Sequence, residues 1–468
     1  MLDKFYKTPQ RSAYLVLLFL AIISIVYNMF LPLHGDEAYY WMWSHKLQTS
    51  YYDHPAMIAY MIYLSNFISQ DEWGVRLVNV FSLSITSLYI YKLTAEISDN
   101  KTALNALLIS SSVILVQSGY IITTPDTPLL LFWTLSLYYG YMALFYGKRK
   151  DFVLTGVFLG FTMISKYSAI LLVFSFLIFV LLKRRDLFTN PLTYLLIGIS
   201  LLIVSPMLYW NYQHDWISFL FQIDHGSADG FRVNLGDAIA FIAGQFILFS
   251  PIFTWILFYY MFKEKLAYKD DKIFFIILTT VVTLLFFIYK GLFKPMGLNY
   301  TAPAYVGAAI FVSYIITKYD LQKQLKVGLI IAIIFSLTGR IAMLFYLDKV
   351  QERMYASDRI VERFSQHIQD GDKLYGAHLT TAAYIKYYLP DHPDTDVAID
   401  SRYSHYDMVR DEKEWHKDGL VLCRNNKREA ELKKYYKSVE LIDTYVVIPR
   451  IRIFYTYRVS NPKQIEKK

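Results

Sequence analysis

The stretch KRKDFVLTGVFLGFTMISKYSAILLVFSFLIFVLLKRR at residues 148–185 decides how the chain is organised. Its apolar part is interrupted only around Ser165-Lys166-Tyr167, and basic residues flank it at both ends. Basic loops stay on the cytoplasmic face of a membrane, so both flanks are expected on the same side. A single crossing cannot return the chain to that side. The stretch therefore predicts two short membrane helices with Lys166 at the outer turn between them.

Similar apolar runs fill most of the chain, and a membrane helix needs about 20 such residues. We predict eleven crossings, at residues 12–32, 74–96, 102–118, 127–146, 152–164, 168–182, 191–208, 237–261, 273–289, 299–317 and 327–346. With the N-terminus inside, the inner segments carry 17 Lys and Arg in 49 residues, whereas the outer segments carry 5 in 94. This asymmetry predicts a cytoplasmic N-terminus and, after an odd number of crossings, an extracytoplasmic C-terminal tail.

The tail has a different composition from the rest of the chain. In residues 347–468, 42 of 122 side chains are charged, against 44 of the preceding 346. Its local patterns predict strands at 373–377, 396–399 and 420–423, helices at 380–389 and 428–436, and two further strands within 439–458. The expected fold is mainly α. It has a polytopic bundle of about eleven helices over residues 1–346, with outer loops 33–73 and 208–236, and a small C-terminal α/β domain over 347–468.

Composition also excludes several classes of protein. Charged residues make up 18% of the chain and hydrophobic ones 55%, whereas an average soluble domain is about 25% charged. The single cysteine, Cys423, excludes an internal disulfide and any cysteine-built metal site. The net charge of +8 is dispersed, so we expect no nucleic-acid partner. The chain has no Gly-rich phosphate loop, so we expect no ATP- or NAD-driven reaction.

Polar side chains gather at the predicted outer ends of the helices. The first outer loop holds Asp36, Glu37, Tyr39, Tyr40, Tyr52, Asp53 and His54, and the later loops hold Asp126, Lys166, His214, Asp215, Arg232, Lys290, Lys294 and Asn299. Carboxylates and cations thus converge on one membrane face. Such a face suits transfer from a lipid phosphate, because cations stabilise a leaving phosphate and a carboxylate can take the proton of the acceptor.

The ordered motifs resemble those of the polytopic C-type-fold glycosyltransferases. They are most similar to bacterial relatives of the dolichyl-phosphate-mannose protein mannosyltransferases and of the lipid A aminoarabinose transferase. The resemblance rests on GDEAYY at 35–40, YDHP at 52–55, TPDTPL at 124–129, SKY at 165–167, SP at 205–206 and WNYQHDW at 210–216. It covers roughly residues 34–310. Two positions depart from the family pattern: Ala56 stands where a second proline is usual, and Tyr300 where tryptophan is usual.

The resemblance implies catalytic roles for the acidic residues. Asp36 would be the base or would orient the acceptor, and Asp126 would line the same cavity. Asp36 could also simply cap a helix. We include Glu37 among these candidates, although a structural role, or a role in supporting Asp36, fits Glu37 better. A metal held by Asp36, Asp126 and His54 lacks the usual helical spacing of ligands, so we assign no cofactor and leave a divalent metal open.

By the same resemblance, Lys166 would hold the donor phosphate. It could instead extend from a helix end to water. The other cations that compete for this duty are Arg76, Arg232, Lys290, Lys294 and Arg340. The predicted substrate pocket comprises Tyr39, Tyr40, Tyr52, Asp53, His54, His214, Asp215 and Asn299.

These inferences predict an integral-membrane glycosyltransferase at the outer face of a bacterial inner membrane. It would move a sugar, with inversion, from a polyprenyl-phosphate donor to lipid A, a polysaccharide or a protein. We also expect membrane lipids among the partners. The alternative is a transporter or flippase of lipid-linked sugars. A transporter should carry its polar groups near the bilayer midplane in broken helices, whereas here they lie at outer helix ends.

Overall fold

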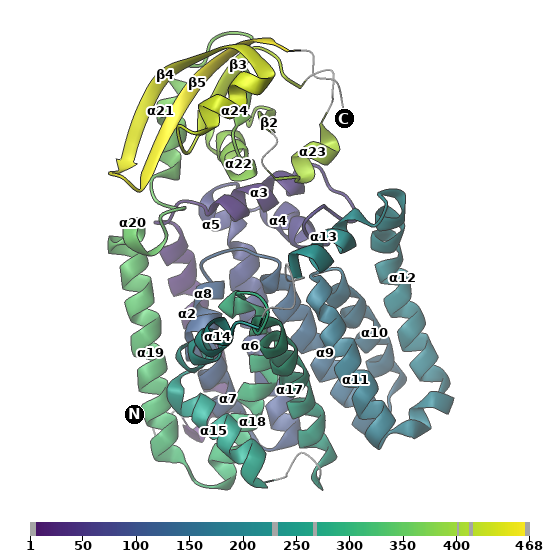
Figure 1. Ribbon diagram of the computed structural model, residues 1–468. Helices are drawn as coiled ribbons and strands as arrows, with labels where there is room; N and C mark the ends of the chain where they lie inside the picture. The colour runs from purple at the N-terminus through teal and green to yellow at the C-terminus, as the bar shows by residue number, and fades with distance from the viewer. Residues whose placement is uncertain (1–5, 227–232, 265–268, 400–401, 411–414, 464–468) are drawn as a thin grey trace. The chain divides into compact units, whose positions relative to one another are not determined.

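The structure is a computed structural model that describes residues 6–226, 233–264, 269–399, 402–410 and 415–463. The described chain is mainly helical, with a small sheet near its C-terminal end (Figure 1). It folds into two compact units. The helical unit comprises Met1–Asn28, His54–Met61 and Arg76–Arg340, and the mixed unit comprises Met29–Asp53, Ile62–Val75 and Ile341–Lys468. Much of the first loop therefore folds with the tail. The predicted domain boundary at residue 346 stays a prediction.

Long helices dominate the helical unit. The α-helices that begin in it are α2 (Pro9–Asn28), α4 (Met57–Ser65), α6 (Leu77–Ile97), α7 (Asn100–Ser112), α8 (Ile114–Gly119), α9 (Asp126–Tyr146), α10 (Arg149–Met163), α11 (Ile170–Lys183), α12 (Pro191–Gln213), α13 (Ile217–Gly226), α14 (Leu235–Leu248), α15 (Pro251–Glu264), α17 (Asp271–Gly291), α18 (Ala304–Lys318) and α19 (Gln322–Phe345). Short 3₁₀ turns connect some of them: η1 (Tyr167–Ala169), η2 (Arg185–Thr189) and η3 (Leu298–Thr301).

Within the described residues, six helices are long and apolar enough to cross a membrane. They are Pro9–Asn28, Glu72–Ile97, Asp126–Tyr146, Pro191–Gln213, Asp271–Gly291 and Gln322–Phe345. Two shorter apolar helices, Tyr167–Lys183 and Ala304–Lys318, also match predicted spans. The predicted multi-span helical bundle is confirmed, whereas the number of eleven crossings stays a prediction.

The predicted spans 237–261 and 102–118 are each broken in their interior. The span 237–261 is a bent pair, α14 and α15, with 110° between the helices. Ser250 has a left-handed φ of 72° and precedes Pro251, whose ring disfavours helical geometry in the residue before it. The span 102–118 breaks where Val113 is extended between α7 and α8. The serine run before this break binds backbone carbonyls through its hydroxyls and so competes with the helix.

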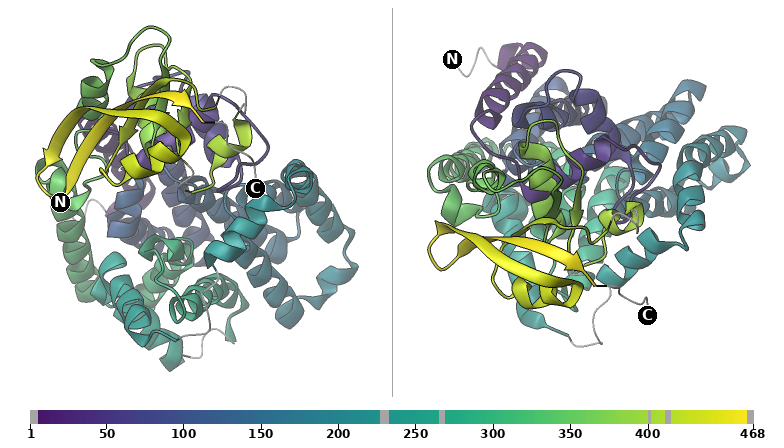
Figure 2. Two further views of the ribbon diagram at one scale, coloured as in Figure 1. Left: turned by 45° about the horizontal axis from the view of Figure 1, so that its top comes forward. Right: turned by 90° about the horizontal axis from the view of Figure 1, so that it is seen from above.

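Helix α10 packs between α9 and α12 in the helical unit (Figures 1 and 2). Glycine permits its close approach to α12. A Cβ on Gly156 would lie 2.7 Å from the carbonyl oxygen of Leu196, and one on Gly160 would lie 2.8 Å from Ile203 Cβ. Small residues at helix contacts are typical of membrane bundles, where van der Waals packing drives association. Helix α10 carries the Lys166 turn at its end, so this packing fixes where the turn begins.

The mixed unit is built around a small sheet. The described strands are β1 (Lys373–Gly376), β2 (Thr395–Val397), β3 (Gly419–Cys423), β4 (Tyr436–Ile448) and β5 (Arg452–Pro462), in the order β2-β1-β3-β5-β4. The strands β2, β1 and β3 run parallel, whereas β3, β5 and β4 pair antiparallel. Its described helices are α3 (Gly35–Ser44), α5 (Glu72–Val75), α20 (Leu347–Val350), α21 (Ser357–Ser365), α22 (Leu379–Tyr388), α23 (His405–Val409) and α24 (Arg428–Tyr435). The predicted strands and helices of the tail are confirmed.

Helix α22 joins the sheet to the first loop within the mixed unit. It crosses over from β1 to β2, and Gly376 lets it approach, because a Cβ there would lie 2.2 Å from the Ala382 nitrogen. On its other side it packs against α3. The hydroxyl of Tyr388 accepts from the Leu33 N–H at 2.8 Å. The rings of Trp41 and Tyr387 meet edge to face at 4.9 Å. The tail therefore holds the start of α3 in place.

Gly35 is the tightest point of this contact, which predicts the effect of adding one methyl group. A Cβ on Gly35 would lie 2.8 Å from Thr380 Cβ and 2.9 Å from its Cγ2. We expect Gly35→Ala to lower the free energy of unfolding of the mixed unit by about 1–3 kcal/mol. The measurement is denaturant unfolding of the purified full-length protein. The matched control is Gly198→Ala in α12, where nothing lies within 4 Å of a Cβ; this change should be neutral or stabilising. Equal stability of the two variants would contradict the packing.

His378 gives the mixed unit a dependence on pH. It caps α22, and its Nδ1 accepts the N–H of Thr380 at 3.3 Å, which requires a neutral ring. Burial, together with the smaller effect of the charges of Arg402, Arg428 and Arg353, lowers the pKa of His378 from 6.5 to about 4. A depressed pKa in the folded state means that this stability is present above pH 6.5 and is lost as the pH falls through about 4.

We therefore expect the free energy of unfolding to fall by about 3 kcal/mol through His378 alone between pH 7 and pH 4. His378→Asn keeps a capping oxygen but does not titrate. The variant should thus lose less stability than the wild type over the same range, as measured by unfolding at several pH values. If the free energy of unfolding depends on pH identically in the two proteins, His378 does not cause that dependence.

Candidate functional site

Asp126 stands at the first position of α9 in the helical unit. The preceding Pro125 begins the helix without a side-chain cap, and the Thr127 hydroxyl fixes this end by donating to Asn79 Oδ1 at 3.0 Å. The positive end of the helix macrodipole favours a carboxylate here. The carboxylate does not cap the helix. Its Oδ1 accepts from Lys166 Nζ at 2.6 Å, and its Oδ2 accepts from Asn299 Nδ2 at 2.8 Å.

Lys166 lies in the turn between α10 and η1, where the sequence predicted a turn. Its backbone is extended, with φ −159° and ψ 142°. The turn is fixed on both sides. The Ile164 carbonyl accepts from the Met57 N–H at 3.1 Å, and the Tyr167 hydroxyl lies 2.7 Å from Ser218 Oγ. The Lys166 side chain is only 14% exposed, so it does not extend to water.

Asn299 belongs to η3, which α14 holds in place. Gln245 Oε1 of α14 accepts from the Thr301 and Tyr305 hydroxyls, each at 2.7 Å. The residue after Asn299 also takes part, because the Lys166 ammonium lies 4.9 Å from the centre of the Tyr300 ring. The sequence alone shows Tyr300 only as a departure from the family pattern. We call Asp126, Lys166, Asn299 and Tyr300 the Asp126 cluster.

The Asp126 cluster joins three segments that the sequence places in separate loops. Both oxygens of Asp126 are engaged, so the carboxylate is better suited to holding Lys166 and Asn299 than to taking a proton. An ammonium group carries three N–H donors. Asp126 takes one of them, which leaves donors of Lys166 for the oxygens of an anionic ligand. The cluster can thus present an oriented ammonium group to a phosphate.

Asp36 occupies the first turn of α3 in the mixed unit, and the interpretation of Asp36 as a helix cap is wrong. His34 is the cap: its Nδ1 accepts from the Asp36 N–H at 3.2 Å. Glu37 completes a capping box by accepting from the His34 N–H at 2.8 Å, and its side chain is fully buried. The Asp36 side chain is 44% exposed, 3.6 Å from His34 Nδ1, and no described residue donates a hydrogen bond to it. Its carboxylate is therefore available to a substrate.

A buried carboxylate lies elsewhere in the mixed unit. Asp53 accepts from the Tyr39 hydroxyl at 2.8 Å and from the Arg402 guanidinium. Burial raises the pKa of Asp53, and the charge of Arg402 opposes that rise. The His405 N–H donates to the Tyr39 oxygen at 2.8 Å, so the tail closes this network. Sequence reasoning missed Arg402, because no motif or spacing distinguishes it from the other tail arginines.

The other predicted pocket residues have varied surroundings. Tyr39, Tyr40 and Tyr52 are buried rather than open to a sugar. His54 and His214 are half-buried, and the ring of His214 stacks on Trp210 at 4.1 Å. Asp215 is exposed and has a left-handed φ of 51°.

Two of the competing cations make hydrogen bonds elsewhere in the helical unit. Arg76 is buried and donates to the Asn28 carbonyl at 3.4 Å. Arg340 lies among helices and donates to Gln117 Oε1 at 2.9 Å. Lys290 lies in the last turn of α17, and Lys294 lies just beyond that helix. Arg232 lies outside the described residues. Among the residues that the structure describes, no group of three or more His, Cys, Asp or Glu is placed to hold a metal ion.

Comparison with known proteins adds independent information. The family model of dolichyl-phosphate-mannose-protein mannosyltransferases matches residues 53–210, a range that contains Asp126 and Lys166. The lipid A galacturonosyltransferase RgtD of Rhizobium johnstonii is 23% identical over 315 residues, which cover 66% of this chain and 66% of that protein. The chain thus spans slightly less than two thirds of the length of this relative.

Solved structures share the fold. The ArnT structure from Cupriavidus metallidurans in the apo state has a TM-score of 0.70 at 12% identity, covering 96% of this chain and 99% of ArnT. The same protein bound to undecaprenyl phosphate gives 0.68 at 13% identity, with the same coverage. The archaeal oligosaccharyltransferase AglB from Archaeoglobus fulgidus, in complex with an inhibitory peptide and a dolichol-phosphate, gives 0.50 at 13% identity, covering 88% and 69%. The chain therefore has the C-type glycosyltransferase fold and is related to the dolichyl-phosphate-mannose-protein mannosyltransferase family.

Proposed function

We propose that this protein is an integral-membrane glycosyltransferase that takes a sugar from a polyprenyl-phosphate donor. The observation that carries the proposal is the Asp126 cluster, in which Asp126 orients Lys166 and Asn299 in turn holds Asp126. Undecaprenyl phosphate and dolichol-phosphate are bound in two of the structures that share the fold, which supports a lipid-phosphate donor. The site is proposed to face the outer side of a bacterial inner membrane, because the charge asymmetry of the loops favours that orientation.

In the proposed reaction, Lys166 binds the phosphate that links the sugar to the lipid. The bond between the sugar carbon and the phosphate oxygen breaks, and negative charge grows on the departing polyprenyl phosphate. An ammonium group held out of water stabilises that charge more strongly than a solvated one does. Asp126 and Asn299 act by orienting this group, so that little reorganisation is needed during the reaction.

Asp36 is proposed to act on the acceptor. Its carboxylate is exposed and accepts no hydrogen bond from the described residues, so it can approach an acceptor hydroxyl. It would take the hydroxyl proton while the oxygen bonds to the sugar carbon from the face opposite the phosphate, with inversion. An acceptor phosphate would already be anionic and would need no base. RgtD acts on lipid A, which supports a lipid A acceptor, whereas a polysaccharide or a protein remains the alternative.

The direct test is to incubate the purified protein with a panel of polyprenyl-phosphate sugars and candidate acceptors. Consumption of one donor together with release of free polyprenyl phosphate supports the proposal. A flippase would instead move a lipid-linked sugar across a vesicle bilayer with its bond intact. That outcome would contradict group transfer.

The role of Lys166 predicts a selective loss of donor affinity. Lys166→Ala removes a charge-assisted contact worth about 1.5–3 kcal/mol, so the donor KM should rise about 10- to 150-fold. The acceptor KM should change much less. Steady-state kinetics with each substrate varied in turn measure both constants.

Lys183→Ala is the matched control for this variant. Lys183 also pairs with an aspartate, Asp271, at 2.7 Å, but it lies outside the Asp126 cluster. The donor KM should not change in this control. An unchanged donor KM in Lys166→Ala would return Lys166 to a structural role.

The role of Asp36 predicts a loss of turnover that depends on the acceptor. Asp36→Asn keeps the size of the side chain but cannot take a proton. With a hydroxyl acceptor, kcat should fall by about 10²–10⁴-fold. Folding should be preserved, because no described residue donates a hydrogen bond to this carboxylate. With a phosphate acceptor, much more activity should remain. Near wild-type kcat with a hydroxyl acceptor would exclude Asp36 as the base.

A further inference from the structure

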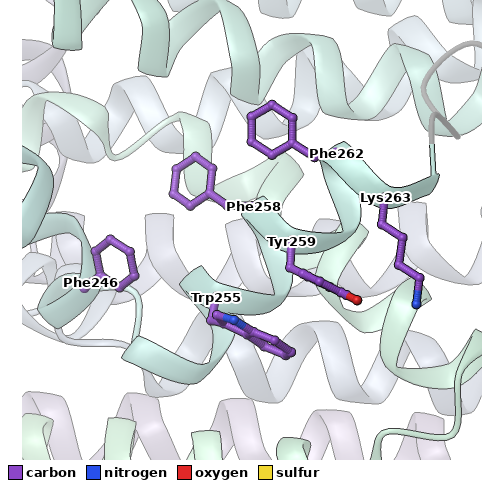
Figure 3. Close-up of a pocket in the computed structure, with 6 residues that line it drawn as sticks. All are labelled: Phe246, Trp255, Phe258, Tyr259, Phe262 and Lys263. Atoms are coloured by element: carbon purple, nitrogen blue, oxygen red, sulfur yellow. The ribbon is translucent and has the colours of Figure 1, made fainter.

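An aromatic groove lies along the bent helix pair of the helical unit. It is lined by Phe246 of α14 and by Trp255, Phe258, Tyr259, Phe262 and Lys263 of α15, and its volume is about 510 Å³ (Figure 3). Volumes of about 300–1,000 Å³ are typical of sites for small molecules. Neither the Asp126 cluster nor the proposed transfer uses this groove, so it requires its own explanation.

The walls of the groove are apolar and open. Trp255 and Tyr259 stack with ring centres 5.0 Å apart, and Phe246 lies 6.4 Å from Phe258 across the bend. Trp255 is 51% exposed and Phe262 is 80% exposed. Such exposure of large aromatic rings is costly in water and favourable in a bilayer. The α14–α15 pair is also apolar enough to lie in a membrane. The groove is therefore expected to face hydrocarbon chains.

One end of the groove carries a positive charge. Trp255, Tyr259 and Lys263 recur every four residues and so share one side of α15 (Figure 3). The Lys263 ammonium lies 5.3 Å from the ring centre of Tyr259 and forms no ion pair with any residue in the described part of the chain. Lys263 lies in the last turn of α15, where the partial negative charge of the helix C-terminus favours a cation.

We infer that this groove binds one anionic phospholipid, with an acyl chain along the aromatic rings and its phosphate at Lys263. Two features match this ligand: an apolar channel, and the cation Lys263 at the end of that channel. The row from Trp255 to Lys263 spans about 12 Å at 1.5 Å per residue, which accommodates the upper part of an acyl chain. A zwitterionic lipid would fill the apolar channel equally well but would gain less from Lys263.

Trp255 supplies a direct readout of occupancy, because bromine atoms on an acyl chain quench the fluorescence of a contacting indole. The experiment adds brominated phosphatidylglycerol or brominated phosphatidylcholine to the purified full-length protein in micelles. We expect phosphatidylglycerol to quench at about fivefold lower concentration than phosphatidylcholine, because one interfacial lysine strengthens the binding of an anionic lipid by about that factor. Trp255→Phe identifies the signal of this one residue among the 8 tryptophans. This variant should lose the component that saturates at low phosphatidylglycerol.

Lys263→Gln tests the charge. It should remove the preference for phosphatidylglycerol while leaving quenching by phosphatidylcholine intact. The matched control is Lys183→Gln: Lys183 ends α11 and lies over the Phe274 ring at 5.6 Å, but it does not line the groove. The control should keep the preference. Equal quenching by both lipids in the wild type, or a preference that survives Lys263→Gln, would overturn the inference. A groove filled by a second copy of the chain would give dimers in native mass spectrometry and no dependence on lipid charge, which would also overturn it.

Discussion

The contact between Lys166 and Asp126 is the constraint on which the candidate site of the helical unit depends. The two side chains are 14% and 13% exposed and lie 2.6 Å apart. Withdrawing two charges from water is costly unless further polar contacts satisfy them. Asn299 satisfies the second oxygen of Asp126, and the ring of Tyr300 faces the ammonium. The start of α9, the turn after α10 and η3 must therefore all be placed correctly before the pair can form.

The sequence predicted the helices well, because runs of apolar residues of sufficient length have few alternatives in a membrane. The strands and helices of the tail were also predicted. Hydropathy did not predict the places where the backbone bends within an apolar run. The composition of 237–261 is that of one span, and only the left-handed Ser250 before Pro251 produces the bend. The close packing of α3 against α22 could not be predicted either, because it depends on tertiary contacts at Gly35.

The candidate site was predicted residue by residue but not as an arrangement. Asp126, Lys166 and Asn299 were each selected for their chemistry and position in a loop, yet their mutual contact arises only from the packing of distant helices. That contact also changes the role expected of Asp126, because both of its carboxylate oxygens already accept hydrogen bonds. In the mixed unit, His34 rather than Asp36 caps α3, which leaves the Asp36 carboxylate open. Arg402 carries no sequence signal and is revealed only by its contact with buried Asp53.

The most direct test of the central claim is a double-mutant cycle on the donor KM with Lys166→Gln, Asp126→Asn and the double variant. If Asp126 acts by orienting Lys166, removing the lysine makes the aspartate irrelevant. The double variant should then have the same donor KM as Lys166→Gln alone, while Asp126→Asn changes the donor KM by itself. Strong coupling of this kind is expected for residues in direct contact. If the two single changes simply multiply in the double variant, each residue acts independently and the account of the cluster is wrong.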